Sequence, residues 1–333
     1  MSNYDSGKRS KKIPIIIFIV AIVGFVAYGK ITNHLSDQWF LDRIAVSNYE
    51  PSAEIEELVE KSSMNDEGRL MFYASKPELN ERVEFNENCK DLLNESSMVL
   101  GCYNGQIYIF KITDERIKGV KYVTSAHEML HAAYDRLGIF ERNHINELVA
   151  EEVSKTKDPN ILEQLKLYSE LEPGHETNEM HSILGTESRE LSPELEEYYS
   201  RYFYDRSIVV NEHEKYKGVF DELADRADEI EQKMAALETE INIQRSNYEA
   251  STRKLSNDID VFNLEADNGS YSSEASFYAR RNEIIAEQNT LSRQVDDINL
   301  LINEYNEYVV ELQALGRDVQ ILQNSLDSKK EVE

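Results

Sequence analysis

From about residue 208 to the C-terminus, apolar side chains recur at intervals of three, four or seven residues. This spacing places them along one face of a helix and is typical of a coiled coil. A polar break at Asp267-Asn268-Gly269-Ser270 divides the series into two segments. Two such helices joined by a short polar loop predict an antiparallel coiled-coil hairpin over residues 208–333, in preference to one helix continuing through a dimer. The apolar positions are Tyr216, Phe220, Leu223, Ala227, Ile230, Met234, Leu237, Ile241 and Tyr248, then Ile284, Leu291, Val295, Ile298, Ile302, Tyr305, Val309, Leu312, Val319 and Leu326.

Residues 30–207 carry shorter and more varied patterns. Residues 106–110 are β-branched and aromatic and follow the turn signal Asn104-Gly105, which predicts a β-hairpin with Cys102 on its first arm. The strand 106–110 is expected either to present an edge or to lie inside a sheet. The predicted fold class is therefore α+β, mainly α, with a small hairpin or sheet. Amphipathic helices are predicted at 53–59, 66–74, 141–155, 160–170, 175–187 and 193–205, after a stalk or first helix at 31–52.

The N-terminal residues 13–29 form an apolar run without charge. At about 1.5 Å per helical residue, this run reaches the short end of the length that spans a bilayer. Four basic residues within 8–12 precede it, and positive charge stays on the cytoplasmic side. We therefore predict a cytoplasmic tail (1–12), a single transmembrane anchor (13–29) in the cell membrane, and an exported remainder. The alternative is a signal peptide cleaved near Ala27-Tyr28-Gly29, which would make the protein secreted.

Charge and cysteine content narrow the class of protein. The formal net charge of −27 excludes a generic nucleic-acid binder, because such a protein needs clustered lysine and arginine against phosphates. Cys89 and Cys102 are the two cysteines of the chain. In an exported protein they predict a disulfide closing a short loop, and the alternative is two free thiols.

The run His127-Glu128-Met129-Leu130-His131 has the spacing of a zinc site. On a helix, His127 and His131 share one face and can bind one Zn²⁺, while Glu128 lies close enough to take a proton from a metal-bound water. We expect this helix to begin near Val123, with Thr124 or Ser125 as its cap, and to stop at Gly138. The pattern predicts His127 and His131 as metal ligands and Glu128 as the catalytic base.

A zinc enzyme needs a third protein ligand. The metzincin pattern would require glycine at 134 and histidine at 137, but the chain has Tyr134 and Leu137. A glutamate on a later helix is the other solution, and the segment 174–187 supplies several candidates. Tyr134 is interpreted as packing, and Asp135 as a structural helix aspartate or an orienting group.

A family resemblance points to one of these candidates. The run 127–135, H-E-M-L-H-A-A-Y-D, resembles the H-E-x-x-H-A-x-x-D helix of thermolysin-like gluzincins, and 178–182, N-E-M-H-S, resembles their N-E-x-x-S. The glutamate of that motif is the third zinc ligand, so the resemblance implies Glu179. The chain departs from the family in a longer gap between the motifs and in Ile183, where the family has aspartate. The segment 123–137 also resembles uncharacterised membrane-anchored bacterial proteins with a C-terminal coiled coil.

The other ligand candidates are His175, Glu176, His181 and Glu187. His181 has two further interpretations: a donor to the oxyanion of the tetrahedral intermediate, which would make it catalytic, or a buried helix histidine. The tyrosine-rich stretch 198–204 is interpreted as core rather than as a binding surface.

We therefore predict a membrane-anchored, extracytoplasmic zinc metallopeptidase with a zincin-like domain over 30–207 and the hairpin over 208–333. Its expected partners are a peptide or protein substrate and an envelope protein bound through the coiled coil. The alternative is a membrane-anchored coiled-coil adaptor with an inactive or structural metal site. A structural zinc would have four protein ligands, whereas the enzyme requires an open position beside Glu128.

Overall fold

The computed structural model describes residues 37–90, 99–171 and 174–329. They form two compact units. The first contains the described residues up to Gly218 together with those from Gln323 onward, and the second is Val219–Leu322. Described residues 323–329, at the end of the second long helix, thus belong to the first unit.

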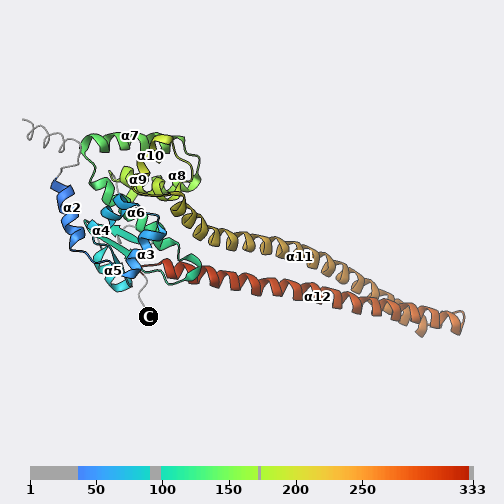
Figure 1. Ribbon diagram of the computed structural model, residues 1–333. Helices are drawn as coiled ribbons and strands as arrows, with labels where there is room; N and C mark the ends of the chain where they lie inside the picture. Colours follow the sequence, from blue (N-terminus) through green and yellow to red (C-terminus); the bar gives the residue numbers. More distant parts are fainter. Residues whose placement is uncertain (1–36, 91–98, 172–173, 330–333) are drawn as a thin grey trace, which may run out of the picture. The chain divides into compact units, whose positions relative to one another are not determined.

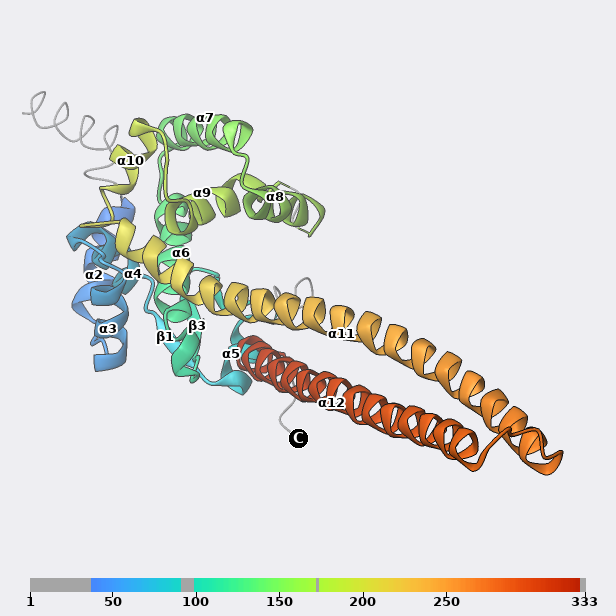
Figure 2. The same ribbon diagram turned by 90° about the vertical axis from the view of Figure 1, so that its right-hand side faces the viewer.

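The first unit is mostly helical and carries one small sheet (Figures 1 and 2). Both long C-terminal helices have one end in this unit and run into the second. The elements are α2 (Asp37–Ser47), α3 (Ala53–Lys61), α4 (Asp66–Ala74), β1 (Glu78–Asn80), α5 (Arg82–Asn88), β2 (Gly101–Tyr103), β3 (Ile107–Phe110), the 3₁₀ helix η1 (Glu115–Ile117), α6 (Val120–Asp135), α7 (Ile139–Lys155), α8 (Pro159–Leu171), α9 (Glu176–Glu187), α10 (Pro193–Tyr199), α11 (Ser207–Asp267) and α12 (Glu274–Leu326).

The sheet has the strand order β1-β3-β2. β1 is parallel to β3, and β2 is antiparallel to β3 with Gly101 opposite Ile109. The predicted hairpin is confirmed as β2 and β3. The interpretation of residues 106–110 as a sheet edge is wrong, because β3 is the central strand and its Ile107 and Ile109 are fully buried. The edge next to α6 is β2.

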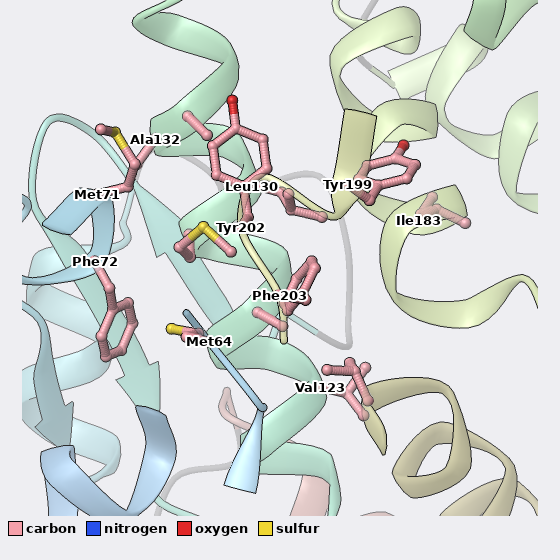
Figure 3. Close-up of a cluster of buried hydrophobic side chains, with 14 of the residues drawn as sticks. Met64, Met71, Phe72, Val123, Leu130, Ala132, Ile183, Tyr199, Tyr202 and Phe203 are labelled. Atoms are coloured by element: carbon pink, nitrogen blue, oxygen red, sulfur yellow. The ribbon is translucent and has the colours of Figure 1, made fainter. Parts of the chain in front are cut away.

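Helix α6 runs through the middle of the hydrophobic core. Its Met129 and Leu130 are fully buried, as are Phe72 of α4 and Tyr199 of α10. Figure 3 shows Phe72, Leu130 and Tyr199 in this cluster. At 25–30 cal/mol per Å² of apolar surface, a side chain of this size contributes about 2 kcal/mol when it is buried. The core therefore holds the helix that carries the two histidines in place.

The expected ends of α6 were wrong. The helix begins at Val120 with Gly119 as its N-cap, directly after η1, so neither Thr124 nor Ser125 caps it. The Ser125 hydroxyl instead donates to the Lys121 carbonyl within the helix. At the other end α6 stops at Asp135, and Gly138 is the N-cap of α7 rather than the end of α6.

Helix α9 packs closely on α6 because Gly185 has no side chain. A Cβ atom at this position would lie 2.4 Å from Leu130 Cδ1 and 2.7 Å from Tyr199 Cε1. Since such contacts are far inside van der Waals distance, only glycine permits this approach. The close packing brings the first turns of α9 to the histidine face of α6.

The tyrosine-rich stretch forms core, as predicted. Tyr198, Tyr199 and Tyr202 are buried, while Tyr204 is mostly exposed. The helix expected at 193–205 is shorter, because α10 ends at Tyr199. The chain then turns back to pair with the start of α4: the Asn65 amide donates to the Tyr202 carbonyl. This tertiary pairing replaces the last helical turns.

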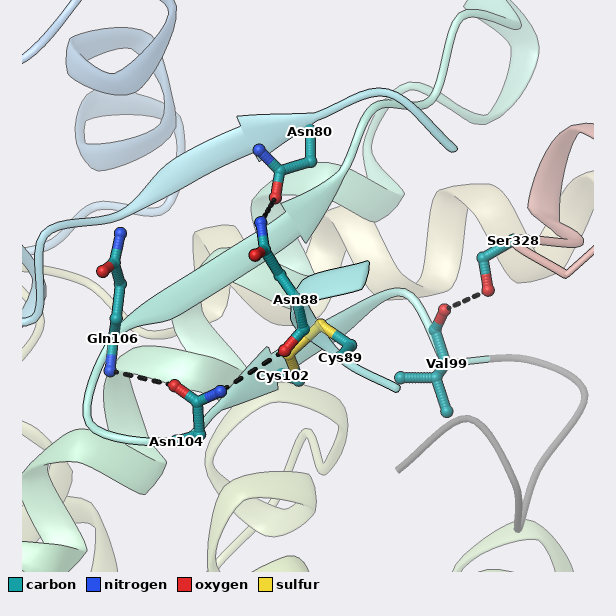
Figure 4. Close-up of a disulfide and its surroundings, with 8 residues drawn as sticks. All are labelled: Asn80, Asn88, Cys89, Val99, Cys102, Asn104, Gln106 and Ser328. Atoms are coloured by element: carbon teal, nitrogen blue, oxygen red, sulfur yellow. Dashed lines mark hydrogen bonds between the residues drawn. A yellow bond between two sulfur atoms is a disulfide. The ribbon is translucent and has the colours of Figure 1, made fainter. Parts of the chain in front are cut away.

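The predicted disulfide between Cys89 and Cys102 is present and joins the end of α5 to β2 (Figure 4). The Asn104 side chain reinforces the same junction by donating to the Asn88 carbonyl. Nearby, the Ser328 hydroxyl donates to the Val99 carbonyl at 2.9 Å, so the residues just after α12 lie against the approach to β2. The disulfide and this contact both tie β2 and the residues before it to other parts of the unit.

Loss of the disulfide is expected to destabilise the first unit. The bridge closes a loop with a sequence separation of 13 residues, for which chain entropy gives about 3 kcal/mol. In the double variant Cys89→Ser/Cys102→Ser the free energy of unfolding should therefore fall by about 3 kcal/mol, and the urea midpoint should be lower. Reductant should have the same effect on the unmodified protein. An unchanged urea midpoint would contradict the expectation.

Within the second unit, α11 and α12 run antiparallel, which confirms the predicted hairpin and excludes one continuous helix. Ion pairs join the two arms along their length: Arg226–Glu311, Lys254–Glu287 and Arg280–Asp258. Along these pairs the residue numbers rise on α11 and fall on α12, as an antiparallel register requires. Aromatic rings of Phe262, Tyr271 and Phe277 pack together near the turn.

The predicted anchor at 13–29 lies outside the described residues. Among the residues that are described, no helix combines the length and the apolar character needed to cross a bilayer.

Candidate metal centre

Two helices bring three metal-binding side chains together. His127 and His131 lie one turn apart on α6, and Glu179 lies in the first turn of α9. The Nε2 atoms of His127 and His131 are 3.0 Å apart. Glu179 Oε1 is 3.3 Å from His131 Nε2, and Glu179 Oε2 is 3.5 Å from His127 Nε2. Among the described residues, these three form the group of histidine, cysteine and acidic side chains that could hold a metal ion.

The spacing of the donor atoms suits a single metal ion. Zinc bound tetrahedrally at about 2.1 Å from nitrogen and oxygen places its ligand atoms about 3.4 Å apart. The three separations of 3.0, 3.3 and 3.5 Å are close to this value. Two imidazoles and one carboxylate are also donors that zinc accepts. The residues present therefore fit a zinc ion held by three protein ligands.

Ser182 orients one of the ligands. Its hydroxyl oxygen lies 3.3 Å from His131 Nδ1, on the side of the ring away from the ligand group. When Nε2 binds a metal, Nδ1 carries the proton and donates it to Ser182. Ser182 lies one turn after Glu179 on α9, so the same helix supplies a ligand and fixes the orientation of another. Ser182 is part of the motif N-E-M-H-S, but the motif alone does not indicate this role.

Glu128 is buried beside the ligand group and faces β2. A Cβ atom at Gly101 would lie 2.5 Å from Glu128 Oε1 and 2.6 Å from Thr124 Cγ2. Gly101 thus leaves the space that the Glu128 carboxyl occupies. Burial raises the pKa of this carboxyl to about 8. A carboxyl whose pKa lies near neutrality can both accept and return a proton, as a general base requires.

The charges of the ligand group are coupled. Burial would raise the pKa of the Glu179 carboxyl, but the two imidazoles outweigh it and lower that pKa to about 2. Burial would lower the pKa of His127, but its hydrogen bond to Glu179 raises it to about 9. For His131, burial prevails and lowers the pKa. The carboxylate is therefore held ionised between the two imidazoles, in the form that binds a cation.

His181 does not join this group. It is fully buried, and its Nε2 lies 2.9 Å from the Tyr198 hydroxyl. Its ring packs against those of Tyr134, Tyr198 and Tyr199, and burial lowers its pKa to about 3. This environment favours the interpretation of His181 as a buried helix histidine over that of a catalytic oxyanion donor.

The remaining ligand candidates lie in other contacts. His175 is exposed at the N-cap of α9. Glu176 accepts from the Gly174 amide, and Glu187 accepts from the Gln164 side chain. None of the three belongs to the described metal-binding group, which selects Glu179 from the segment 174–187.

The last two residues of α6, Tyr134 and Asp135, have structural contacts. The Tyr134 hydroxyl donates to Asn146 of α7, which agrees with its interpretation as packing. Asp135 accepts from the Tyr103 hydroxyl of β2 at 3.3 Å. This contact joins the end of α6 to the edge strand.

Removal of the Ser182 hydroxyl is expected to weaken metal binding without abolishing it. The variant Ser182→Ala frees the His131 ring to rotate, and loss of such an orienting contact costs about 10–100-fold in metal affinity. Competition with a chromophoric zinc chelator measures the affinity. Ser169→Ala, on α8 and bonded to the Lys166 carbonyl alone, is the matched control and should bind zinc as the unmodified protein does.

Comparisons with protein-family models, with curated proteins and with solved structures found no match to this chain.

Proposed function

We propose that the protein is a zinc-dependent metallopeptidase of the gluzincin type. The single observation that carries the proposal is the ligand group of His127, His131 and Glu179 with the buried Glu128 beside it. A bound zinc would supply a Lewis acid that polarises a carbonyl group and lowers the pKa of a water molecule. The motif resemblance and the donor geometry point to the same three ligands.

In this proposal Glu128 is the group that moves protons. Its carboxylate accepts a proton from the attacking water as the water oxygen forms a bond to the peptide carbonyl carbon. The carbon–nitrogen bond then breaks, and Glu128 returns the proton to the leaving amine. The products are a carboxylic acid and an amine, and Glu128 ends in its starting form. Gly101 leaves the room beside β2 that the carboxyl occupies.

Strand β2 is suited to bind an extended peptide beside Glu128. The Phe110 amide donates to the Leu100 carbonyl, so the alternate residues Gly101 and Tyr103 direct their backbone groups away from β3. No described backbone group pairs with them there. A substrate strand could add to this edge by main-chain hydrogen bonds. Its carbonyl would then lie near Glu128, because Gly101 touches the Glu128 side chain.

The ligand count favours an enzyme over the adaptor alternative. A structural zinc normally has four protein ligands, whereas the described group offers three. The disulfide supports the proposed location outside the cytoplasm, where an oxidising compartment preserves such a bridge. In that location the hairpin is proposed to bind an envelope protein.

The test is metal-dependent cleavage of a mixture of unstructured peptides by the full chain, followed by mass spectrometry. Cleavage is expected with zinc, should stop when a chelator removes the metal, and should return when zinc is added back. Cleavage that persists after the chelator has lowered zinc content to zero would contradict the proposal.

A further inference from the structure

Helix α2 exposes large apolar side chains on one face. Phe40, Leu41 and Ile44 are each between 50% and 58% exposed. Phe40 and Leu41 lie four and three residues before Ile44, which places all three on the same side of the helix. The opposite side is anchored, because Asp42 is buried and accepts hydrogen bonds from the Arg136 guanidinium at 3.0 to 3.1 Å. Helix α2 is thus fixed on the protein with its apolar face turned outward.

A second exposed apolar pair lies next to α2. Ile139 and Phe140 open α7 and are 72% and 88% exposed. They follow Arg136, the residue that bonds Asp42, by three and four positions. Figures 1 and 2 both show α2 and the first turn of α7 at the same end of the first unit. We define Phe40, Leu41, Ile44, Ile139 and Phe140 as the apolar surface.

The short segment between the predicted anchor and α2 indicates which partner covers this apolar surface. The predicted membrane anchor ends at residue 29, and only residues 30–36 separate it from α2. These residues can reach at most about 25 Å when fully extended. Whatever bilayer holds the anchor is therefore within reach of α2. Large contiguous apolar surfaces are uncommon on soluble proteins and mark interaction sites.

We propose that the apolar surface formed by α2 and the first turn of α7 rests on the lipid bilayer. The contact is apolar rather than electrostatic, because a protein with a net charge of −27 is repelled by anionic headgroups. Side chains of this type insert at the boundary between headgroups and acyl chains. Since Asp42 bonds Arg136 at the end of α6, this contact holds the first unit at the membrane through the metal-bearing helix. The inference rests on the predicted anchor and is independent of peptidase activity.

A tryptophan placed within the apolar surface provides a probe of this contact. Trp39, the one tryptophan of the chain, lies three residues before the buried Asp42 and so on the protein-facing side of α2. The full-length variant Trp39→Phe/Leu41→Trp is reconstituted in vesicles of phosphatidylcholine and of the same lipid brominated near the headgroup, and its tryptophan fluorescence is measured. Bromine quenches at short range, so the emission is expected to fall at least twofold in brominated vesicles. The quenching should persist in 1 M salt, where electrostatic contacts are screened.

The variant Ile139→Asp/Phe140→Asp separates docking from simple tethering. Added to the probe variant, this pair of changes alters neither the introduced tryptophan nor the chain that leads to the anchor, and both positions are exposed. Docking predicts that the variant loses at least half of the quenching. The matched control Val83→Asp alters an exposed apolar residue of α5 and should keep full quenching.

Three results would overturn the proposal. Equal quenching of the probe variant with and without Ile139→Asp/Phe140→Asp would show that the tether alone brings the introduced tryptophan near lipid. Absence of quenching in the probe variant would show that the surface does not touch the bilayer. Tryptophan emission of the probe variant that depends on the protein-to-lipid ratio and not on bromine would assign the surface to a second copy of the chain.

Discussion

The variant Glu128→Gln is expected to bind zinc normally and to cleave peptides about 10²–10⁴ times more slowly than the unmodified protein, because the amide cannot accept the proton of the attacking water. Glutamine has nearly the same shape as glutamate and fits the space beside Gly101. The three ligands are unchanged, so metal affinity should stay within a few fold. Zinc content and cleavage rate are measured on the same preparation.

A second glutamate serves as the control for this variant. Glu176 lies one turn before Glu179 on α9 and accepts from the Gly174 amide without joining the ligand group. Glu176→Gln makes the same chemical change three residues before the ligand Glu179. This variant should keep both zinc binding and peptidase activity. Equal cleavage rates for Glu128→Gln and the unmodified protein would contradict the proposed role of Glu128 as the general base.

The variant Glu179→Ala is expected to lose zinc affinity by more than the 10–100-fold cost of an orienting contact, because it removes a direct ligand. The carboxylate lies 3.3 and 3.5 Å from the two imidazole nitrogens, and no described acidic residue can replace it. Peptide cleavage should fall in parallel. Chelator competition measures affinity, and thermal unfolding without metal establishes that the variant is folded.

His181 offers the comparison that distinguishes the two ligand assignments. His181→Gln should retain zinc binding, with a lower unfolding temperature because it disturbs the buried contact with Tyr198. Tyr198→Phe removes that contact from the other side and leaves the histidine in place. If His181→Gln loses zinc while Glu179→Ala retains it, the third ligand has been assigned to the wrong residue.

The parts of the fold that follow from local periodicity could be predicted from the sequence. Helix α4 has the predicted bounds, and α3 begins at its predicted first residue, Ala53, with Ser52 as its N-cap. The antiparallel hairpin follows from two apolar series and a polar break. In each of these elements the local pattern agrees with the tertiary packing. The secondary structure that the sequence indicates is therefore the one found in the folded protein.

The errors arise where tertiary contacts override local preference. α10 stops early because Tyr202 pairs with Asn65, which is distant in the sequence. β3 is the central strand because β1 pairs with it on the side opposite β2. β1 could not be predicted, because its three residues are too few to show a periodic pattern. α6 begins before its expected cap because a 3₁₀ turn leads directly into it.

The candidate site divides in the same way. The spacing of His127 and His131 is a property of one helix, so it could be read from the sequence. The approach of Glu179 depends on how closely α9 packs on α6 at Gly185, which spacing along the chain does not encode. Two further features likewise appear only in the folded protein. They are the contact between Gly101 and Glu128 and the hydrogen bond between His131 and Ser182.

Zinc K-edge X-ray absorption of the metal-loaded full chain distinguishes a catalytic metal site from a structural one. We expect one zinc per chain, coordinated by two imidazoles, one carboxylate and one oxygen that does not come from the protein. A zinc with four protein ligands, iron in place of zinc, or no stoichiometric metal would contradict it.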